Sequence, residues 1–164
     1  MNNTLLSLIV ALALASGALA QDLAGTWTYR SYHNKPLVMV GEDDDTAAAK
    51  ALSLIFGEGI VTLEAPAGGT VRGVLDLGPG YALDLSGPYY PEAAGSPARV
   101  ELVGAGRAGT ATAGWEYRYV GFLAPTWEAG VRQVPALVGT VLRAKQHGGS
   151  MPGYTTSFMA VKRP

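Results

Sequence analysis

The chain has 164 residues, with 12 basic and 13 acidic side chains and a formal charge of −1 at pH 7, and it contains no cysteine. This length suits one domain, the scattered charges exclude a nucleic-acid surface built from clustered Lys and Arg, and the lack of cysteine excludes disulfides and thiolate zinc sites. Only 15% of the residues are charged, while 22 are glycine and 10 are proline. Such a composition is typical of many short strands joined by tight turns.

The stretch 1–20 is predicted to be a secretory signal peptide. Its apolar run over residues 5–15 is too short to cross a bilayer. Ala18 and Ala20 are small residues at the positions that a signal peptidase recognises. Cleavage after Ala20 leaves one domain over residues 21–164, with no stable membrane anchor, in the periplasm or outside the cell. A retained membrane anchor is the alternative that this stretch leaves open.

Eight stretches of the remaining chain are predicted to be β-strands, because apolar and polar residues alternate in several of them and turn-forming residues separate them. They span residues 24–32, 53–64, 69–77, 81–89, 98–103, 114–123, 134–145 and 154–162. Short connections force antiparallel neighbours, and such a sheet has two exposed edges unless it closes. The predicted fold is therefore all-β, an eight-stranded antiparallel up-and-down barrel, which either fills with side chains or holds one small ligand.

Two longer connections interrupt this pattern. In the first, Asp45 is predicted to cap a short helix over residues 46–52. The acidic run over residues 42–45 is interpreted as a solvated loop, with a calcium site as the alternative. The second connection, 124–133, carries Trp127, which is predicted to contact a ligand or a partner unless it folds back onto the barrel.

Three glycines, Gly104, Gly106 and Gly109, have the G-x-G-x-x-G spacing of a dinucleotide-binding loop. That loop requires a helix directly after the third glycine, with its N-terminus facing the pyrophosphate. The residues after Gly109 instead form a turn and then an aromatic strand. We therefore expect these glycines to supply positive φ angles in a hairpin connection.

The strand over residues 114–123 carries three aromatic residues on one face, Trp115, Tyr117 and Tyr119. If this face points inward, it lines the barrel together with Tyr29 of the first strand, and an aromatic wall with a few polar tips is how small-molecule sites are built. The alternatives are that these rings lie outside or simply fill the core.

The two histidines, His33 and His147, each follow an odd-numbered strand, which places both at the same rim of an up-and-down barrel. Together with Tyr29 or Glu58 they would make an acid–base pair or a two-histidine metal site. The alternative is that both are solvated loop residues, and no cofactor is assigned.

Gly25-Thr26-Trp27 on the first strand resembles the first-strand motif of the calycin superfamily, the lipocalins and avidins. The resemblance implies that Trp27 plugs one end of the barrel under a cationic side chain, for which Arg143 and Arg163 are the candidates. Gly114-Trp115 and the final strand resemble the corresponding strands of the avidin group.

The chain departs from the avidin group at the positions that bind biotin. Tyr29 and His33 stand where that group has polar residues after the first-strand tryptophan, Leu75 replaces a tyrosine, and Thr156 replaces an aspartate. The resemblance therefore implies the fold, and biotin binding is not carried over.

Three functions are compatible with these features. The favoured one is a binding protein for a small apolar or aromatic molecule, with Tyr29, His33, Trp115, Tyr117, Tyr119 and Trp127 as candidate ligand contacts. The first alternative is a protein-binding barrel, an inhibitor or accessory subunit of a secreted enzyme, because small bacterial protease inhibitors also resemble this barrel. The second alternative is an enzyme, which would need the histidines or buried carboxylates to converge in a cavity.

Overall fold

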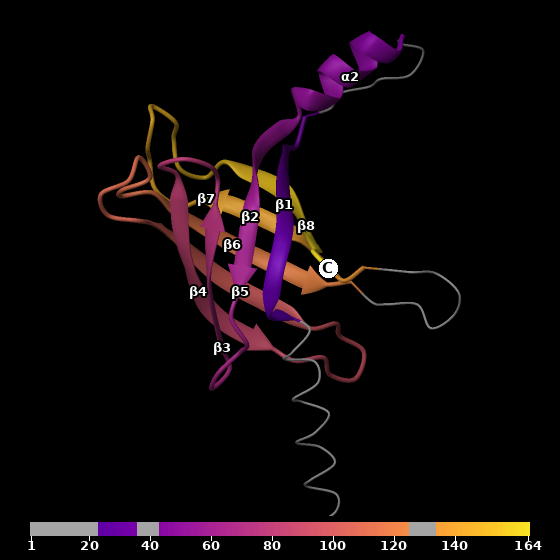
Figure 1. Ribbon diagram of the computed structural model, residues 1–164, viewed down its shortest axis with the longest axis vertical. Coiled ribbons are helices and arrows are strands. Elements are labelled where there is room, and N and C mark those ends of the chain that lie inside the picture. The colour runs from indigo at the N-terminus through magenta and orange to yellow at the C-terminus, as the bar shows by residue number, and fades with distance from the viewer. Residues whose placement is uncertain (1–22, 36–42, 125–133) are drawn as a thin grey trace, which may run out of the picture.

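The computed structural model describes residues 23–35, 43–124 and 134–164, and the stretch assigned to the signal peptide lies outside these ranges. Its elements are β1 (Gly25–His33), α2 (Asp44–Leu52), β2 (Ile55–Leu63), β3 (Thr70–Asp76), β4 (Ala82–Tyr90), β5 (Arg99–Gly106), β6 (Glu116–Leu123), β7 (Ala136–Arg143) and β8 (Thr155–Lys162). The eight strands form a closed barrel in chain order, and every neighbouring pair is antiparallel (Figure 1). The predicted fold class is confirmed.

Closure of the barrel depends on β1, which pairs with both β2 and β8. Trp27 lies opposite Val61 on one side and Lys162 on the other, so neither edge of the sheet is left unpaired at this level. Alternate side chains of each strand then point inward, as the sequence pattern predicts. The largest fully buried members of this core are Trp27, Leu23, Leu75, Leu83, Val71, Val100 and Val141.

Trp27 is fully buried, and its indole Nε1 donates a hydrogen bond to the Leu23 carbonyl at 3.1 Å. The cation over its ring is Lys162, whose Nζ lies 5.6 Å from the ring centroid. The candidates drawn from the resemblance are therefore corrected, because Arg143 ends β7 at the opposite end of the barrel. Arg163 contacts β1 through its backbone N–H, which donates to the Thr26 carbonyl.

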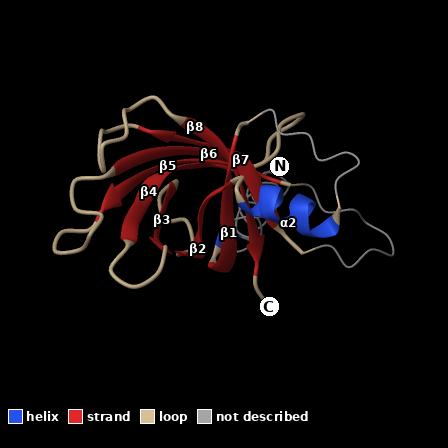
Figure 2. Cartoon of the chain, turned by 90° about the horizontal axis from the view of Figure 1, so that it is seen from above, coloured by secondary structure: helices blue, strands red, loops and turns tan. Residues whose placement is uncertain are grey.

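The helix α2 begins earlier than predicted. Its N-cap is Asp43 rather than Asp45, because Asp43 has an extended backbone and its carboxylate accepts hydrogen bonds from the Thr46 backbone N–H at 2.9 Å and the Thr46 hydroxyl at 2.8 Å. Figure 1 and Figure 2 show α2 projecting away from the barrel wall. It is far too short to cross a membrane, and the described ranges hold no other helix long and apolar enough to do so.

The three glycines of the G-x-G-x-x-G pattern have two different roles. Gly109 has a φ of 77° in the turn after β5, as predicted. Gly104 and Gly106 lie within β5 without positive φ, so that part of the prediction is wrong. A Cβ on Gly104 would come within 2.8 Å of the Tyr119 ring, so this glycine makes room inside the barrel for an aromatic side chain.

Replacing Trp27 with alanine is expected to lower the free energy of unfolding by about 3–5 kcal/mol, because it removes a large buried ring and leaves a cavity. Urea unfolding followed by circular dichroism measures the change. Val120→Ala, on the outer face of β6, is the control and should change stability by less than about 0.5 kcal/mol. A loss below about 1 kcal/mol for Trp27→Ala would contradict the burial of the ring.

Candidate functional site

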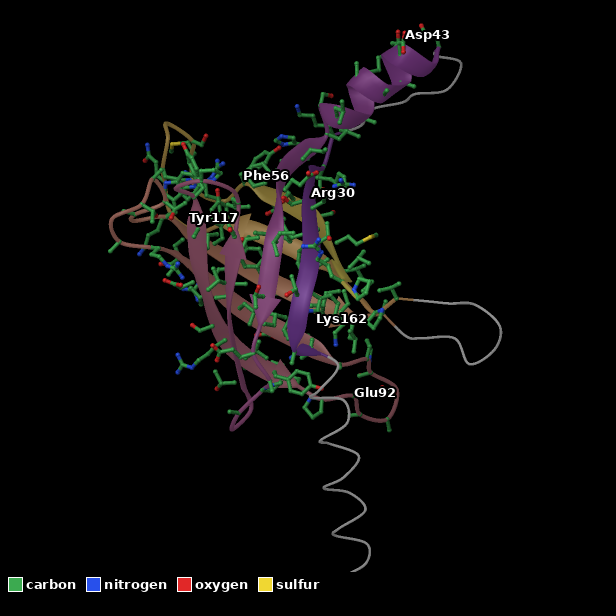
Figure 3. The ribbon with its side chains drawn as sticks, viewed as in Figure 1. Arg30, Asp43, Phe56, Glu92, Tyr117 and Lys162 are labelled. Carbon is green, nitrogen blue, oxygen red and sulfur yellow. The ribbon has the colours of Figure 1, made fainter. Side chains whose placement is uncertain are left out.

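The interior of the barrel is hollow at one end, which we call the open end, where β1, β3, β5 and β7 finish. A cavity of about 210 Å³ lies there. Figure 3 shows two of its lining residues, Phe56 and Tyr117, at this end of the barrel. The cavity is lined by Tyr29, Ser31, Phe56, Gly57, Leu75, Leu77, Leu83, Trp115, Tyr117, Tyr119, Val141, Arg143 and His147.

The aromatic face of β6 points inward. Tyr117 and Tyr119 are buried, whereas Val120 and Phe122 are exposed on the outer face of the same strand. Tyr119 meets Tyr29 of β1 across the barrel in an edge-to-face contact, with ring centroids 6.4 Å apart. The structure thus brings together four of the candidate ligand contacts, Tyr29, Trp115, Tyr117 and Tyr119, around one cavity.

The opposite half of the barrel is filled with side chains. The Phe158 ring packs against Tyr29 and Tyr119, with centroids 5.7 Å and 5.9 Å away. Beyond these rings, the remaining void has a volume of only about 30 Å³ and is lined largely by aliphatic residues. This void is too small for a ligand, so among the described residues of the barrel interior the larger space lies at the open end.

The rim of the cavity is built around His147. Its ring stacks on Trp115, with centroids 4.0 Å apart and an angle of 15° between the planes. Its Nε2 lies 2.7 Å from the Tyr117 hydroxyl, a hydrogen bond that connects the rim to the cavity wall. This contact orients both the imidazole and the phenol at the entrance.

His33 lies at the same end of the barrel, as predicted, but it lines an adjoining open groove rather than the cavity. Its Nδ1 lies 2.6 Å from the Tyr154 hydroxyl. Each histidine therefore has its own tyrosine partner, while Phe56 and Arg143 line both the groove and the cavity.

The expected participation of Glu58 is wrong, because its carboxylate pairs with Arg30 at 2.7 Å on the exposed outer face. Within the described ranges, no group of three His, Asp or Glu side chains is placed to hold a metal ion. Trp127 lies outside the described residues. The candidate site therefore consists of the cavity and its rim.

Burial changes the acidity of the polar groups in the cavity. It raises the pKa of Tyr29 to about 12, an effect that nearby hydroxyls of Ser31 and Tyr119 partly offset. Burial also raises the pKa of Tyr119 well above its usual value, and the neighbouring tyrosines add to this shift. Both phenols therefore remain protonated near neutral pH and can donate hydrogen bonds.

The imidazoles at the open end are less basic than usual. Burial lowers the pKa of His147, and the positive charge of Arg143 lowers it further. Burial also lowers the pKa of His33, with a smaller effect from the charge of Lys35. Both rings are therefore predominantly neutral at pH 7.

Arg143 and Phe56 are among the cavity residues that were not predicted as ligand contacts. Arg143 could have been found, because the period-two pattern of β7 places it on the same inward face as Leu137 and Val141. Phe56 could not, because a β-bulge leaves it between Ile55 and Gly57, which pair with consecutive residues of β1. A bulge locally shifts which side chains point inward and which point outward. The alternation of apolar and polar residues in the sequence does not reveal where a bulge occurs.

A comparison with models of known protein families found no match, and a comparison with curated proteins found no significant similarity.

The buried phenols make stability sensitive to alkaline pH. The unfolded chain releases a tyrosine proton near pH 10.0, whereas folded Tyr29 holds its proton to about pH 12, so stability is complete below pH 10 and is lost as the pH rises through this window. Tyr29→Phe should flatten the dependence of the unfolding free energy on pH by up to about 1.4 kcal/mol per pH unit. Urea unfolding at several pH values between 9 and 11 checks this. An identical slope in both proteins would contradict the burial of Tyr29.

The lowered pKa of His147 makes the stability of the fold depend on pH in the acidic range. Because the unfolded chain takes up the proton first, the contribution of His147 to stability is present above its usual pKa of 6.5 and is lost as the pH falls below that value. We expect the imidazole C–H resonances of His147 to titrate below pH 6.5, and Arg143→Gln to raise that midpoint. A midpoint unaffected by Arg143→Gln would contradict the proximity of the two charges.

Proposed function

We propose that the protein is an exported binding protein for a small aromatic molecule, and that the cavity at the open end is its binding site. The observation that supports this most is the difference between the two halves of the barrel. One half is filled, whereas the other keeps an aromatic-lined cavity with a few polar tips, the usual construction of a small-molecule site. A barrel selected only for stability would fill both halves.

The size of the cavity limits the ligand. An apolar cavity of roughly 150 Å³ accommodates one benzene molecule, and the cavity here measures about 210 Å³. A single ring with one or two small substituents therefore fits, and a drug-sized molecule of several rings does not. The rings of Phe56, Trp115 and Tyr117 offer faces and edges for aromatic contacts with such a ligand.

We further propose that the barrel is of calycin type. Support comes from the burial of Trp27 at the filled end and from the cationic side chain over its ring, although that cation is Lys162. The departures from the avidin group have a consequence for the site. Tyr29 and Leu75 both line the cavity in place of that group's smaller or more polar biotin contacts, which argues for a different ligand.

A second candidate, binding of another protein, is favoured by a row of apolar side chains on the outer face. Phe122 of β6 lies opposite Val138 of β7, which lies opposite Met159 of β8. These side chains are 38%, 37% and 45% exposed. Contiguous exposed apolar surface is common at protein contacts, and a protein partner would be expected to cover this row.

Binding of single-ring probes tests the proposed function. Phenol and benzyl alcohol, titrated into ¹⁵N-labelled protein, should shift the amide resonances of Tyr29, Trp115 and Tyr117 in a saturable way. Leu77→Trp, which fills part of the cavity, should weaken this binding at least tenfold, whereas Met159→Trp on the outer face should leave it unchanged. Absence of saturable shifts at millimolar probe, or equal effects of the two variants, would contradict the proposal.

Native mass spectrometry of the protein purified after export separates the two candidates. A co-purified small molecule supports the cavity as the functional site, and its mass identifies the ligand class. A co-purified protein that Phe122→Ser and Met159→Ser release would favour the outer face instead.

A further inference from the structure

Arg143 is a buried cation that has no anionic partner in the described part of the chain. Its side chain is largely withdrawn from water, with the residue only 9% exposed. One guanidinium nitrogen donates a long hydrogen bond of 3.5 Å to the Met151 carbonyl, and the buried Nε has no hydrogen-bond partner. The Cζ atom lies 5.6 Å and 5.7 Å from the ring centroids of Phe56 and Tyr154.

The carboxylates of Glu116 and Glu58 form ion pairs with other cations and not with Arg143. Glu116, on the strand paired with β7, forms ion pairs with Lys145 and Arg118, and Glu58 pairs with Arg30 on the outer face. No Asp or Glu of the described residues lines the cavity or the groove. A guanidinium taken out of water without a counter-charge is unfavourable, and an incoming anion would relieve that cost.

The charges around the mouth of the cavity favour an anion as well. Arg143 faces His147 and Tyr117 across the rim, and His33, Tyr154 and Phe56 across the groove. The pKa values of both imidazoles are lowered, so these rings are predominantly neutral at pH 7 and Arg143 carries the formal positive charge at the mouth. A cation in a concave, poorly solvated mouth attracts anions and disfavours cations.

From this arrangement we infer that the ligand is a small aromatic carboxylate, with its ring in the cavity and its carboxylate on Arg143. The inference rests on the proposed function and specifies the class of ligand. Arginine presents two parallel N–H donors that match the two oxygens of a carboxylate. A single buried cation balances one negative charge, which favours a monoanion over a phosphate dianion.

The far end of the cavity adds a second element of recognition. Tyr29 and Tyr119 lie there with protonated hydroxyl groups, and Ser31 contributes a third hydroxyl that donates to the Gly57 carbonyl at 3.2 Å. If the ligand carries a hydrogen-bonding substituent on the side of its ring opposite the carboxylate, that substituent would contact these hydroxyl groups. 4-Hydroxybenzoate carries such a substituent, and we expect it to bind more tightly than benzoate.

The test compares benzoate with benzamide, its uncharged analogue of the same shape, by calorimetry at pH 7.5. Benzoate is expected to bind at least tenfold more tightly than benzamide. Arg143→Gln should abolish this difference between the two probes, and Arg143→Lys should restore part of it. Arg118→Gln, which removes an arginine from the outer face of β6, is the matched control and should preserve the difference.

The outcomes distinguish the inference from the proposed function. If benzamide and benzoate bind equally well, the cavity binds aromatic molecules and the anionic ligand class is wrong. If neither binds, both the proposed function and the inference fail. Thermal melting followed by circular dichroism checks that each variant is folded. If Arg143→Gln is not folded, the ratio of the benzoate and benzamide affinities of the unaltered protein tests the anionic ligand class.

Discussion

Closure of the sheet is the constraint on which the rest of this structure depends. Because β1 pairs with both β2 and β8, every strand is held on two sides, and alternate side chains of all eight strands must share one enclosed interior. The interior of such a barrel is narrow enough for rings from opposite walls to meet, as Tyr29 and Tyr119 do. Where large side chains from opposite walls face one another, they fill the interior of the barrel. The absence of a side chain at Gly104 leaves space for the ring of Tyr119.

The two ends of this interior have different physical characters. At the filled end, the Trp27 indole donates its single hydrogen bond to the Leu23 carbonyl and is covered by Lys162, so this ring has no unused donor. At the open end, phenols, an imidazole and a guanidinium surround a cavity and retain unused hydrogen-bonding capacity. The same enclosure that raises the pKa of the phenols strengthens any interaction that a bound polar group would make.

Charged side chains are also distributed differently between the outer face of the barrel and its interior. The ion pairs of Arg107 with Asp84 and of Arg30 with Glu58 lie on exposed outer positions, where water screens them and they contribute little to stability. Stability must therefore come mainly from the buried apolar core. Glu116 of the neighbouring strand β6 pairs with Lys145 and Arg118, so that strand supplies no carboxylate to the positive charge of Arg143 inside the mouth.

The sequence by itself determined the fold class, the eight strands to within a few residues and the placement of both histidines at one rim. It identified the aromatic face of the strand over residues 114–123, but it left open whether that face points inward. Strand periodicity and short turns are local properties, and an up-and-down order leaves little choice of topology. Only the tertiary structure decided which half of the barrel is hollow, that the bulge in β2 brings Phe56 to the cavity, and that Lys162 rather than Arg143 covers Trp27. These features depend on the register of strands distant in sequence, and a shift of one residue would reverse which side chains face inward.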